Sequence, residues 1–82
     1  LDYNEAIRLS PTGAYYSVRG GYYLYIGNDP QRALQDFNDG IRLDPQLGFL
    51  YDQRSVAYRK LGQDAESDAD KAKACSLDSK YC

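Results

Sequence analysis

Apolar and small side chains recur every three or four residues along most of the chain, which is the period of an amphipathic α-helix. Tyr16, Gly20, Tyr23 and Gly27 follow this spacing. We therefore expect an all-α protein with tight turns between its helices. The expected helices cover residues 1–9, 14–26, 30–43, 47–61 and 64–77.

Turn residues divide the periodic segments at consistent places. Asp29-Pro30 is typical of a helix N-cap followed by proline in the first turn. Asp44-Pro45 favours the end of a helix, because proline restricts the residue before it. Gly62 fits the position just after a helix C-terminus. These signals support the boundaries of the three central turns.

The chain also repeats itself. Residues 1–11 align with 35–45 at a shift of 34, and both align with 69–79. Asp2, Asp36 and Asp70 are identical across these three segments. The stretches between them match at a shift of 35, which places Tyr16 over Tyr51 and Arg19 over Arg54. The two shifts differ because length changes fall in loops, where they cost little.

A 34-residue unit with two helices resembles the tetratricopeptide repeat. Its aromatic–small–aromatic pattern on the first helix corresponds here to Tyr16, Gly20, Tyr23 and Gly27, and then to Tyr51, Ser55, Tyr58 and Gly62. The pattern of the second helix corresponds to Ala33, Phe37, Gly40 and Pro45. The resemblance implies a right-handed superhelical solenoid forming one domain over 1–82. Its parts are the second helix of an incomplete repeat (1–11), full repeats (12–45 and 46–79) and a tail (80–82).

Several residues depart from that family pattern. Arg19 and Arg54 replace an aliphatic residue, Lys71 replaces the aromatic one, and Ser79 replaces the proline. Because the two arginines recur at equivalent positions, we expect a structural role, with each guanidinium stacked on Tyr16 or Tyr51. Lys71 and Ser79 both lie in the last repeat, which indicates an end of the stack.

Composition excludes several kinds of chemistry. The 82 residues include no His and two Cys, so they offer no Ser-His-Asp triad and no four-ligand zinc site of His or Cys. Ten Lys and Arg against twelve Asp and Glu are scattered, which does not suit nucleic acid. No apolar run reaches the length of a membrane span. We expect no enzyme activity, no metal and no cofactor.

Acidic residues alternate at Asp64, Glu66, Asp68 and Asp70, as in a calcium-binding loop. The sixth and twelfth positions of that loop would be Ala69 and Cys75 rather than Gly and Glu. We therefore interpret this run as a solvated helix face near the positive end of a helix dipole.

By resemblance, the first helix of each pair lines a concave surface that binds a partner protein or peptide. The implied partner-binding residues are Ser17, Gly21, Leu24, Tyr25, Asp52, Val56, Arg59 and Lys60. Leu24, Tyr25 and Val56 would contact apolar groups of the partner, and Arg59 and Lys60 would contact acidic ones. Two alternatives remain open: a structural spacer in a larger multi-repeat protein, and self-association through open repeat ends.

Cys75 occupies a core position of the repeat, whereas Cys82 lies beyond the end of the last helix. The run 74–82 resembles the helix-end cysteine pair of secreted Sel1-like, cysteine-rich repeat proteins, which implies a disulfide. A pair of free thiols is the alternative. A bridge requires the chain to reverse after Leu77, because a continued helix would hold the two Cα atoms about 10 Å apart. An oxidised pair would favour a periplasmic or secreted protein, and free thiols a cytoplasmic one.

The chain begins with Leu1 rather than Met, in what we expect to be the middle of a helix. We therefore interpret it as a piece of a longer protein.

Overall fold

The structure is a computed structural model that describes residues 4–5, 8 and 12–82. In this part of the chain it contains four α-helices: α2 (Gly13–Tyr25), α3 (Pro30–Leu43), α4 (Gly48–Lys60) and α5 (Asp64–Leu77). The all-α prediction is confirmed, and these helices match four expected ranges to within one residue at each end. The expected count of five is wrong for the described residues, and the predicted helix over 1–9 falls mostly outside them.

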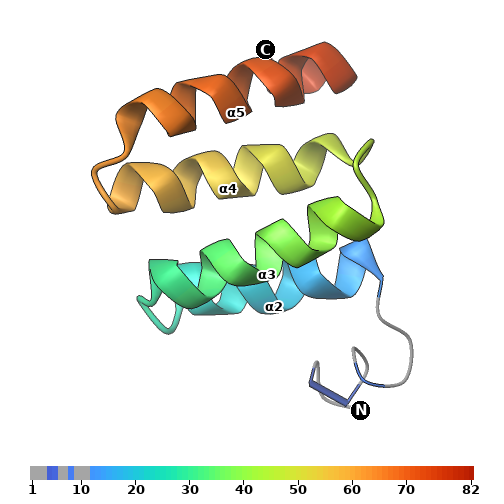
Figure 1. The fold of residues 1–82 in the computed structure, drawn as a ribbon, viewed down its shortest axis with the longest axis vertical. Coiled ribbons are helices and arrows are strands. Elements are labelled where there is room, and N and C mark those ends of the chain that lie inside the picture. The colour runs from blue at the N-terminus through green and yellow to red at the C-terminus, as the bar shows by residue number, and fades with distance from the viewer. Residues whose placement is uncertain (1–3, 6–7, 9–11) are drawn as a thin grey trace.

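Successive helices pack as hairpins. α2 contacts α3 and α4 contacts α5, while α3 joins the two hairpins by packing on α4. Figure 1 shows the result as a stack, with α2 and α3 at one end, α4 in the middle and α5 at the other end. α2 also contacts α4 directly. The arrangement leaves α2 and α5 as the two outer helices of the stack.

The helix boundaries follow the turn chemistry expected from the sequence. The Asp29 side chain accepts a hydrogen bond from the Arg32 N–H at 3.2 Å, and Pro30 occupies the first helical position. Thr12 caps α2 in the same manner by accepting from the Tyr15 N–H. Gly62 adopts φ +76° after α4, a conformation that favours glycine because it has no Cβ. These caps satisfy backbone groups that a helix end leaves without partners.

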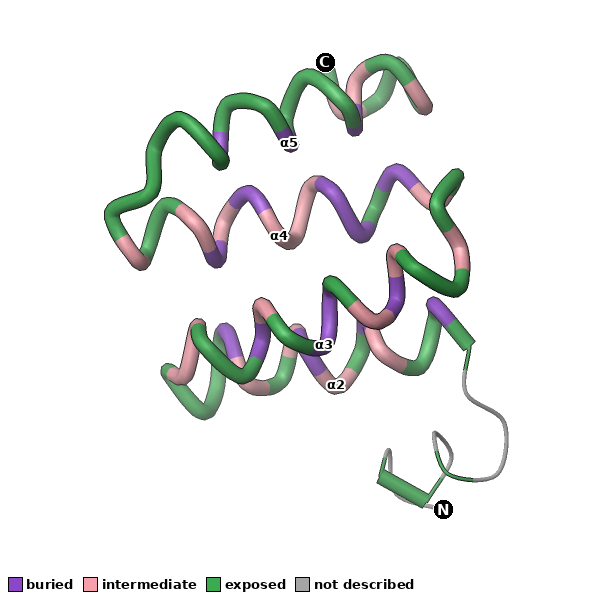
Figure 2. Tube along the Cα trace, viewed as in Figure 1, coloured by how far each residue is buried: buried purple, intermediate pink, exposed green. Residues whose placement is uncertain are grey.

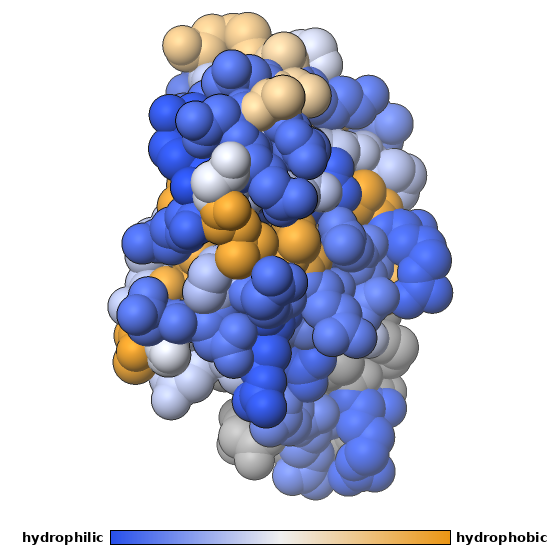
Figure 3. Space-filling model, turned by 60° about the vertical axis from the view of Figure 1, so that its left-hand side comes forward, coloured by the Kyte–Doolittle hydropathy of each residue, from blue (hydrophilic) through white to orange (hydrophobic). Residues whose placement is uncertain are grey.

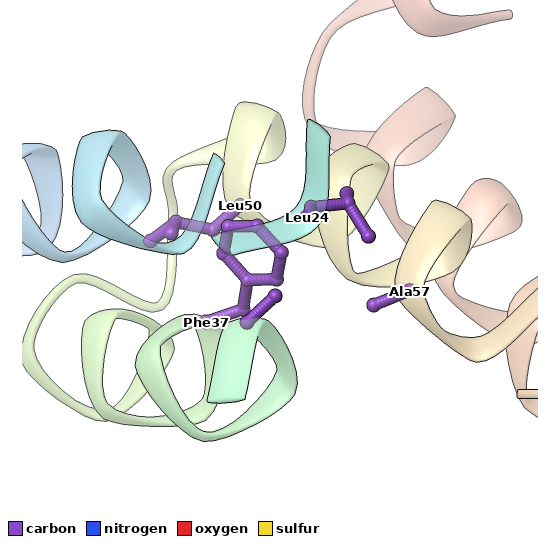
Figure 4. Close-up of a cluster of buried hydrophobic side chains, with 5 residues drawn as sticks. Leu24, Phe37, Leu50 and Ala57 are labelled. Atoms are coloured by element: carbon purple, nitrogen blue, oxygen red, sulfur yellow. The ribbon is translucent and has the colours of Figure 1, made fainter. Parts of the chain in front are cut away.

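The hydrophobic core lies between α2, α3 and α4. Leu24, Ala33, Phe37, Leu50 and Ala57 form a buried cluster in which no member is more than 1% exposed. Figure 4 shows the Phe37 ring between the backbone of α3 and that of α2, with Leu50 and Leu24 on either side. In contrast, α5 is exposed along the side that faces away from α4 (Figure 2). The core is therefore centred on the junction of the two hairpins.

Two helix–helix contacts depend on glycine. A Cβ atom at Gly20 would lie 2.6 Å from the Phe37 ring, and one at Gly40 would lie 2.9 Å from Leu50. Both distances are shorter than carbon atoms tolerate. Gly20 therefore lies at a close contact with an aromatic ring, whereas Gly40 faces a leucine side chain and the Cβ of Tyr16.

The chain reverses direction after α5, as a disulfide requires. Asp78 adopts an extended conformation, and a short 3-10 helix, η1 (Ser79–Tyr81), follows it. This turn brings the Cα atoms of Cys75 and Cys82 to 4.6 Å, and the two residues form a disulfide. The predicted bridge is confirmed, whereas the tail at 80–82 is more regular than we expected.

We expect removal of the Cys75–Cys82 bridge to destabilise the fold measurably. Closing a loop of eight residues stabilises a protein by about 2.5 kcal/mol in the chain-entropy model. The double variant Cys75→Ala/Cys82→Ala should therefore lose about that much free energy of unfolding, measured by urea denaturation. Equal midpoints for the variant and the oxidised parent would contradict the expectation.

No helix in the described ranges is long and apolar enough to cross a membrane.

Candidate functional site

Arg19 of α2 contacts Asp36 of α3 and Asn4 through its guanidinium group. Its Nε and Nη2 atoms donate to the two carboxylate oxygens of Asp36 at 2.9 and 2.7 Å. Its Nη1 atom donates to Oδ1 of Asn4 at 2.8 Å. The same group lies 5.8 Å from the centre of the Tyr16 ring. Arg19 of α2 thus holds a nearly buried carboxylate of α3 in a two-point ion pair.

Arg54 makes the same set of contacts in the second hairpin. It donates to both oxygens of Asp70 at 2.7 Å and to Oδ1 of Asn38 at 2.9 Å. Its guanidinium lies 5.6 Å from the Tyr51 ring and 5.5 Å from the Tyr58 ring. The predicted structural role and stacking of both arginines are therefore confirmed.

These ion pairs link consecutive helices. Asp36 is 3% exposed and Asp70 is 5% exposed, so each carboxylate depends on its arginine for compensation. The hydrogen bonds to Asp36 and Asp70 raise the pKa values of Arg19 and Arg54, although partial burial opposes the rise. Because the folded-state pKa of each arginine is raised, the stabilisation that comes from its protonation is fully present at neutral pH and is lost as the pH rises into strongly alkaline solution.

Sequence reasoning did not predict the carboxylate partners, although the signal was present. Asp36 and Asp70 were recognised as identical positions of the repeat, and Arg19 and Arg54 as recurring departures from it. Opposite charges that recur at equivalent positions of two consecutive helices indicate an ion pair between these helices. Asp70 consequently does not belong to the solvated acidic face on which we placed it, whereas Asp64, Glu66 and Asp68 are exposed.

The predicted partner-binding residues fall into three groups by exposure. Tyr25, Arg59 and Lys60 are exposed, while Gly21, Asp52 and Val56 are half-buried. Ser17 and Leu24 are buried, at 5% and 1% exposure. The eight residues therefore do not form one continuous accessible surface.

The assignment of Leu24 to a binding surface needs correction. Its side chain belongs to the core cluster with Ala33 and Phe37, and Val56 packs against that same cluster. Leu24 is buried because α4 and α3 both pack against this part of α2. Ser17 is also buried, and its hydroxyl donates to the Ala14 carbonyl at 2.7 Å.

Arg59 has partners within its own hairpin. It donates to the Ser67 hydroxyl at 3.2 Å and to an Asp68 carboxylate oxygen at 3.4 Å. These exposed contacts are weak, so a partner could compete for the guanidinium at little cost. Lys60 and Tyr25 are the exposed members of the predicted set that keep a large free surface, with Tyr25 59% exposed.

Apolar side chains also reach the surface elsewhere on α2. Tyr15, Val18, Tyr22 and Ile26 are spaced along one side of this helix and are between 38% and 73% exposed. Figure 3 shows one face of the molecule, where the surface is mostly hydrophilic and apolar side chains emerge in a band across its middle. Exposed apolar surface of this kind is typical of interaction sites.

Within the described residues, no group of three or more acidic or cysteine side chains is placed to hold a metal ion. The arrangement around Asp70 explains why the alternating acids do not gather, since Asp70 faces Arg54 while Asp64 and Asp68 lie on the exposed side.

No protein-family model matches this chain, and no solved structure gives a significant match to it. A function for this chain therefore has to be inferred from the contacts and the exposure of its residues.

Proposed function

We propose that the chain is a non-catalytic protein-interaction module of the tetratricopeptide-repeat type, binding a partner protein or peptide on the face shared by α2 and α4. The observation that carries this proposal is the recurrence of one constellation. Arg19–Asp36–Asn4 and Arg54–Asp70–Asn38 have the same bonding pattern at shifts of 34 and 35 residues. Stacked equivalent units are the architecture of solenoids, which use their surfaces for recognition.

The packing of α4 supports the same interpretation. At a shift of 35, Leu50 and Ala57 of α4 correspond to Tyr15 and Tyr22 of α2. Leu50 and Ala57 are fully buried against the preceding hairpin, whereas Tyr15 and Tyr22 remain 38% and 50% exposed. This packing supports the proposal that one unit stacks on another through equivalent positions of a repeat.

The partner surface that we propose centres on Tyr25 and Lys60 and includes Gly21, Asp52 and Val56. Tyrosine is favoured in interfaces because it offers a large contact area with a polar tip. Lys60 supplies a positive charge that would meet an acidic group of the partner. A peptide could bind this surface in either an extended or a helical conformation.

We expect peptides selected from a random library against the oxidised protein to lose affinity when this surface is changed. Tyr25→Ala and Lys60→Glu should each weaken binding by about tenfold or more, as interface residues of these types do. Lys71→Glu is the matched control, because it makes the same charge change on an exposed position of α5. Isothermal titration calorimetry measures the affinities. Failure to select any peptide, or equal losses in all three variants, would contradict the proposal.

A second candidate function is self-association through α2, because its apolar stripe has no equivalent on α5. The outward side of α5 is exposed and carries charged residues among small alanines, so a head-to-tail stack would not continue there. Contact between two copies would instead pair α2 with α2, as in a two-fold dimer.

If that second candidate is correct, the protein will show a concentration-dependent mass in sedimentation equilibrium. Val18→Asp places a charge in the middle of the stripe and should return the protein to a monomer at all concentrations. Ala72→Asp is the control, because it introduces the same charge at an exposed position of α5. A monomeric parent would exclude self-association and leave the partner-binding proposal in place.

The Cys75–Cys82 disulfide indicates that the protein functions in an oxidising compartment, because cytosolic proteins seldom keep such bridges. We propose a periplasmic or secreted location on this ground. Two alkylatable thiols in freshly isolated native protein, detected by mass spectrometry, would contradict it.

A further inference from the structure

A pocket of about 430 Å³ lies where the C-terminal turn meets the start of α4. Ala14 and Ser17 of α2 line one side, and Leu47 and Phe49 line the floor beside the α3–α4 loop. Leu77 and Tyr81 form the remaining wall. Its volume falls within the range of sites that enclose a small ligand or a side chain. Neither the resemblance nor the sequence pattern pointed to this site.

The wall formed by Tyr81 packs closely on α4. A Cβ atom at Gly48 would lie 3.3 Å from Cε2 of the Tyr81 ring, so the ring sits directly against the glycine backbone. Phe49 lies next to this contact and is 39% exposed, which leaves part of its ring available to an occupant. The pocket is therefore bounded by the rings of Phe49 and Tyr81.

The position of Tyr81 depends on the C-terminal turn. The Asp78 carboxylate accepts from the Lys80 N–H at 3.1 Å, and the Tyr81 N–H donates to the Asp78 carbonyl at 3.0 Å. These contacts are local, and a single exposed 3-10 turn has little stability of its own. The Cys75–Cys82 bridge is the covalent link that returns this turn to α5.

The charged groups at the rim leave the pocket without net charge. Lys80 and Asp78 approach each other, with Nζ and Oδ2 3.9 Å apart, and the Lys80 ammonium lies 5.2 Å from the Tyr81 ring. The Ser17 hydroxyl already donates to the Ala14 carbonyl. One positive and one negative side chain at the rim favour neither an anionic nor a cationic ligand, whereas an apolar group would contact the rings and aliphatic side chains.

The pocket and the surface proposed above both include residues of α2. Ala14 and Ser17 share a helix face with Gly21 and Tyr25, since these positions are three or four residues apart on α2. Ala14 and Tyr25 are about 16 Å apart along α2, at 1.5 Å per residue. A ligand that fills the pocket and also reaches Tyr25 would have to be as long as a peptide.

We infer that this pocket binds an uncharged aromatic or branched aliphatic side chain of a partner peptide, and that the Cys75–Cys82 disulfide keeps the pocket formed. The inference rests on the proposed protein-binding function and identifies one anchoring position for it. Reduction by a dithiol would transfer two electrons and two protons to the bridge, giving two cysteine thiols and a disulfide in the reductant. The released turn would then withdraw Tyr81 from Gly48 and open the wall.

The test uses N-acetyl-phenylalaninamide as the probe and N-acetyl-glutamate amide as its charged counterpart. Amide chemical shifts of the ¹⁵N-labelled, oxidised protein are followed during titration. We expect the phenylalanine probe to shift Ser17, Leu47, Gly48 and Phe49 with a Kd of about 1 mM, which suits a fragment of its size. The glutamate probe should leave these signals unchanged.

Two variants test the part played by the wall. Tyr81→Ala keeps the bridge but removes the ring, and Cys75→Ser/Cys82→Ser removes the bridge but keeps the ring. Each should weaken binding of the phenylalanine probe at least tenfold, while Lys71→Glu should not. If the bridge variant fails to fold, reduction of the parent under native conditions, checked by its circular dichroism, takes its place alongside Tyr81→Ala.

Each outcome decides between the two proposals. The inference is overturned if the phenylalanine probe causes no shifts at the pocket. It is also overturned if the Tyr81→Ala protein or the reduced protein binds the probe as tightly as the oxidised parent does. A selected peptide that shifts Tyr25 and Lys60 but not Gly48 and Phe49 overturns it too, while supporting the proposed function. Failure to select any peptide overturns the proposed function even where the probe binds.

Discussion

Replacing Gly20 with leucine will strongly destabilise the protein, and even alanine will be harmful. A Cβ atom at this position would lie 2.6 to 3.0 Å from three atoms of the Phe37 ring. That ring is fully buried between α2 and α3, so it has no free space into which it can move. Overpacking of a core costs about 1–3 kcal/mol, and leucine should reach the upper end of that range.

Gly21 supplies an adjacent control. A Cβ atom there meets nothing within 4 Å, so alanine would add helix propensity without a clash. We expect Gly21→Ala to raise the free energy of unfolding by up to about 1 kcal/mol. Thermal and urea denaturation of the three variants should therefore give opposite signs at neighbouring positions. Similar stabilities for Gly20→Ala and Gly21→Ala would mean that α2 and α3 are not in close contact at Gly20.

The helices and their ends could be predicted from sequence because local chemistry determines them. Asp29-Pro30 and Gly62 act through their own backbone conformations. In the structure, α3 begins at Pro30 and Gly62 lies just after α4, as the sequence predicts. The close contact at Gly20 could also be predicted, since the small residue recurs opposite an aromatic one. Each of these features depends on neighbours in the chain or on the repeat.

The binding surface could not be predicted to the same extent, because exposure depends on which helices surround a residue. Leu24 and Tyr25 are adjacent in sequence, yet one is in the core and the other is 59% exposed. The pocket beside Tyr81 depends on how the last turn folds back over Gly48. The hydrophobic periodicity does not predict this pocket, because one of its walls is a tail of a few residues that the disulfide links back to α5.

The carboxylate partners of the arginines lie between these two cases. The charges recur in the sequence, but the pairing of α4 with α5 is needed to bring them together. The contacts of Arg54 with Asp70 and Asn38 show how one side chain can connect three helices. The same design in the first hairpin implies that both ion pairs contribute similarly to stability.

Removing either partner of the Arg54–Asp70 pair should cost about 3 kcal/mol. Asp70→Leu would leave the Arg54 guanidinium without its carboxylate partner. Arg54→Met would leave an unpaired negative charge on Asp70, whose side chain is only 7% exposed. For 82 residues the total stability is about 4–12 kcal/mol, so either single variant would be severely weakened.

The double variant Arg54→Met/Asp70→Leu should recover much of that loss, because two apolar groups need no compensation for desolvation. Urea denaturation of the parent, both single variants and the double variant yields the coupling energy between the two positions. Asp68→Ala is the control: its pair with Arg59 is exposed, and its loss should change stability by about 0.5 kcal/mol or less. Additive losses at Arg54 and Asp70 would mean that the two side chains do not act as a pair. If the two hairpins are equivalent units, the cycle at Arg19 and Asp36 will give a coupling energy of similar size, because the bonding pattern is the same.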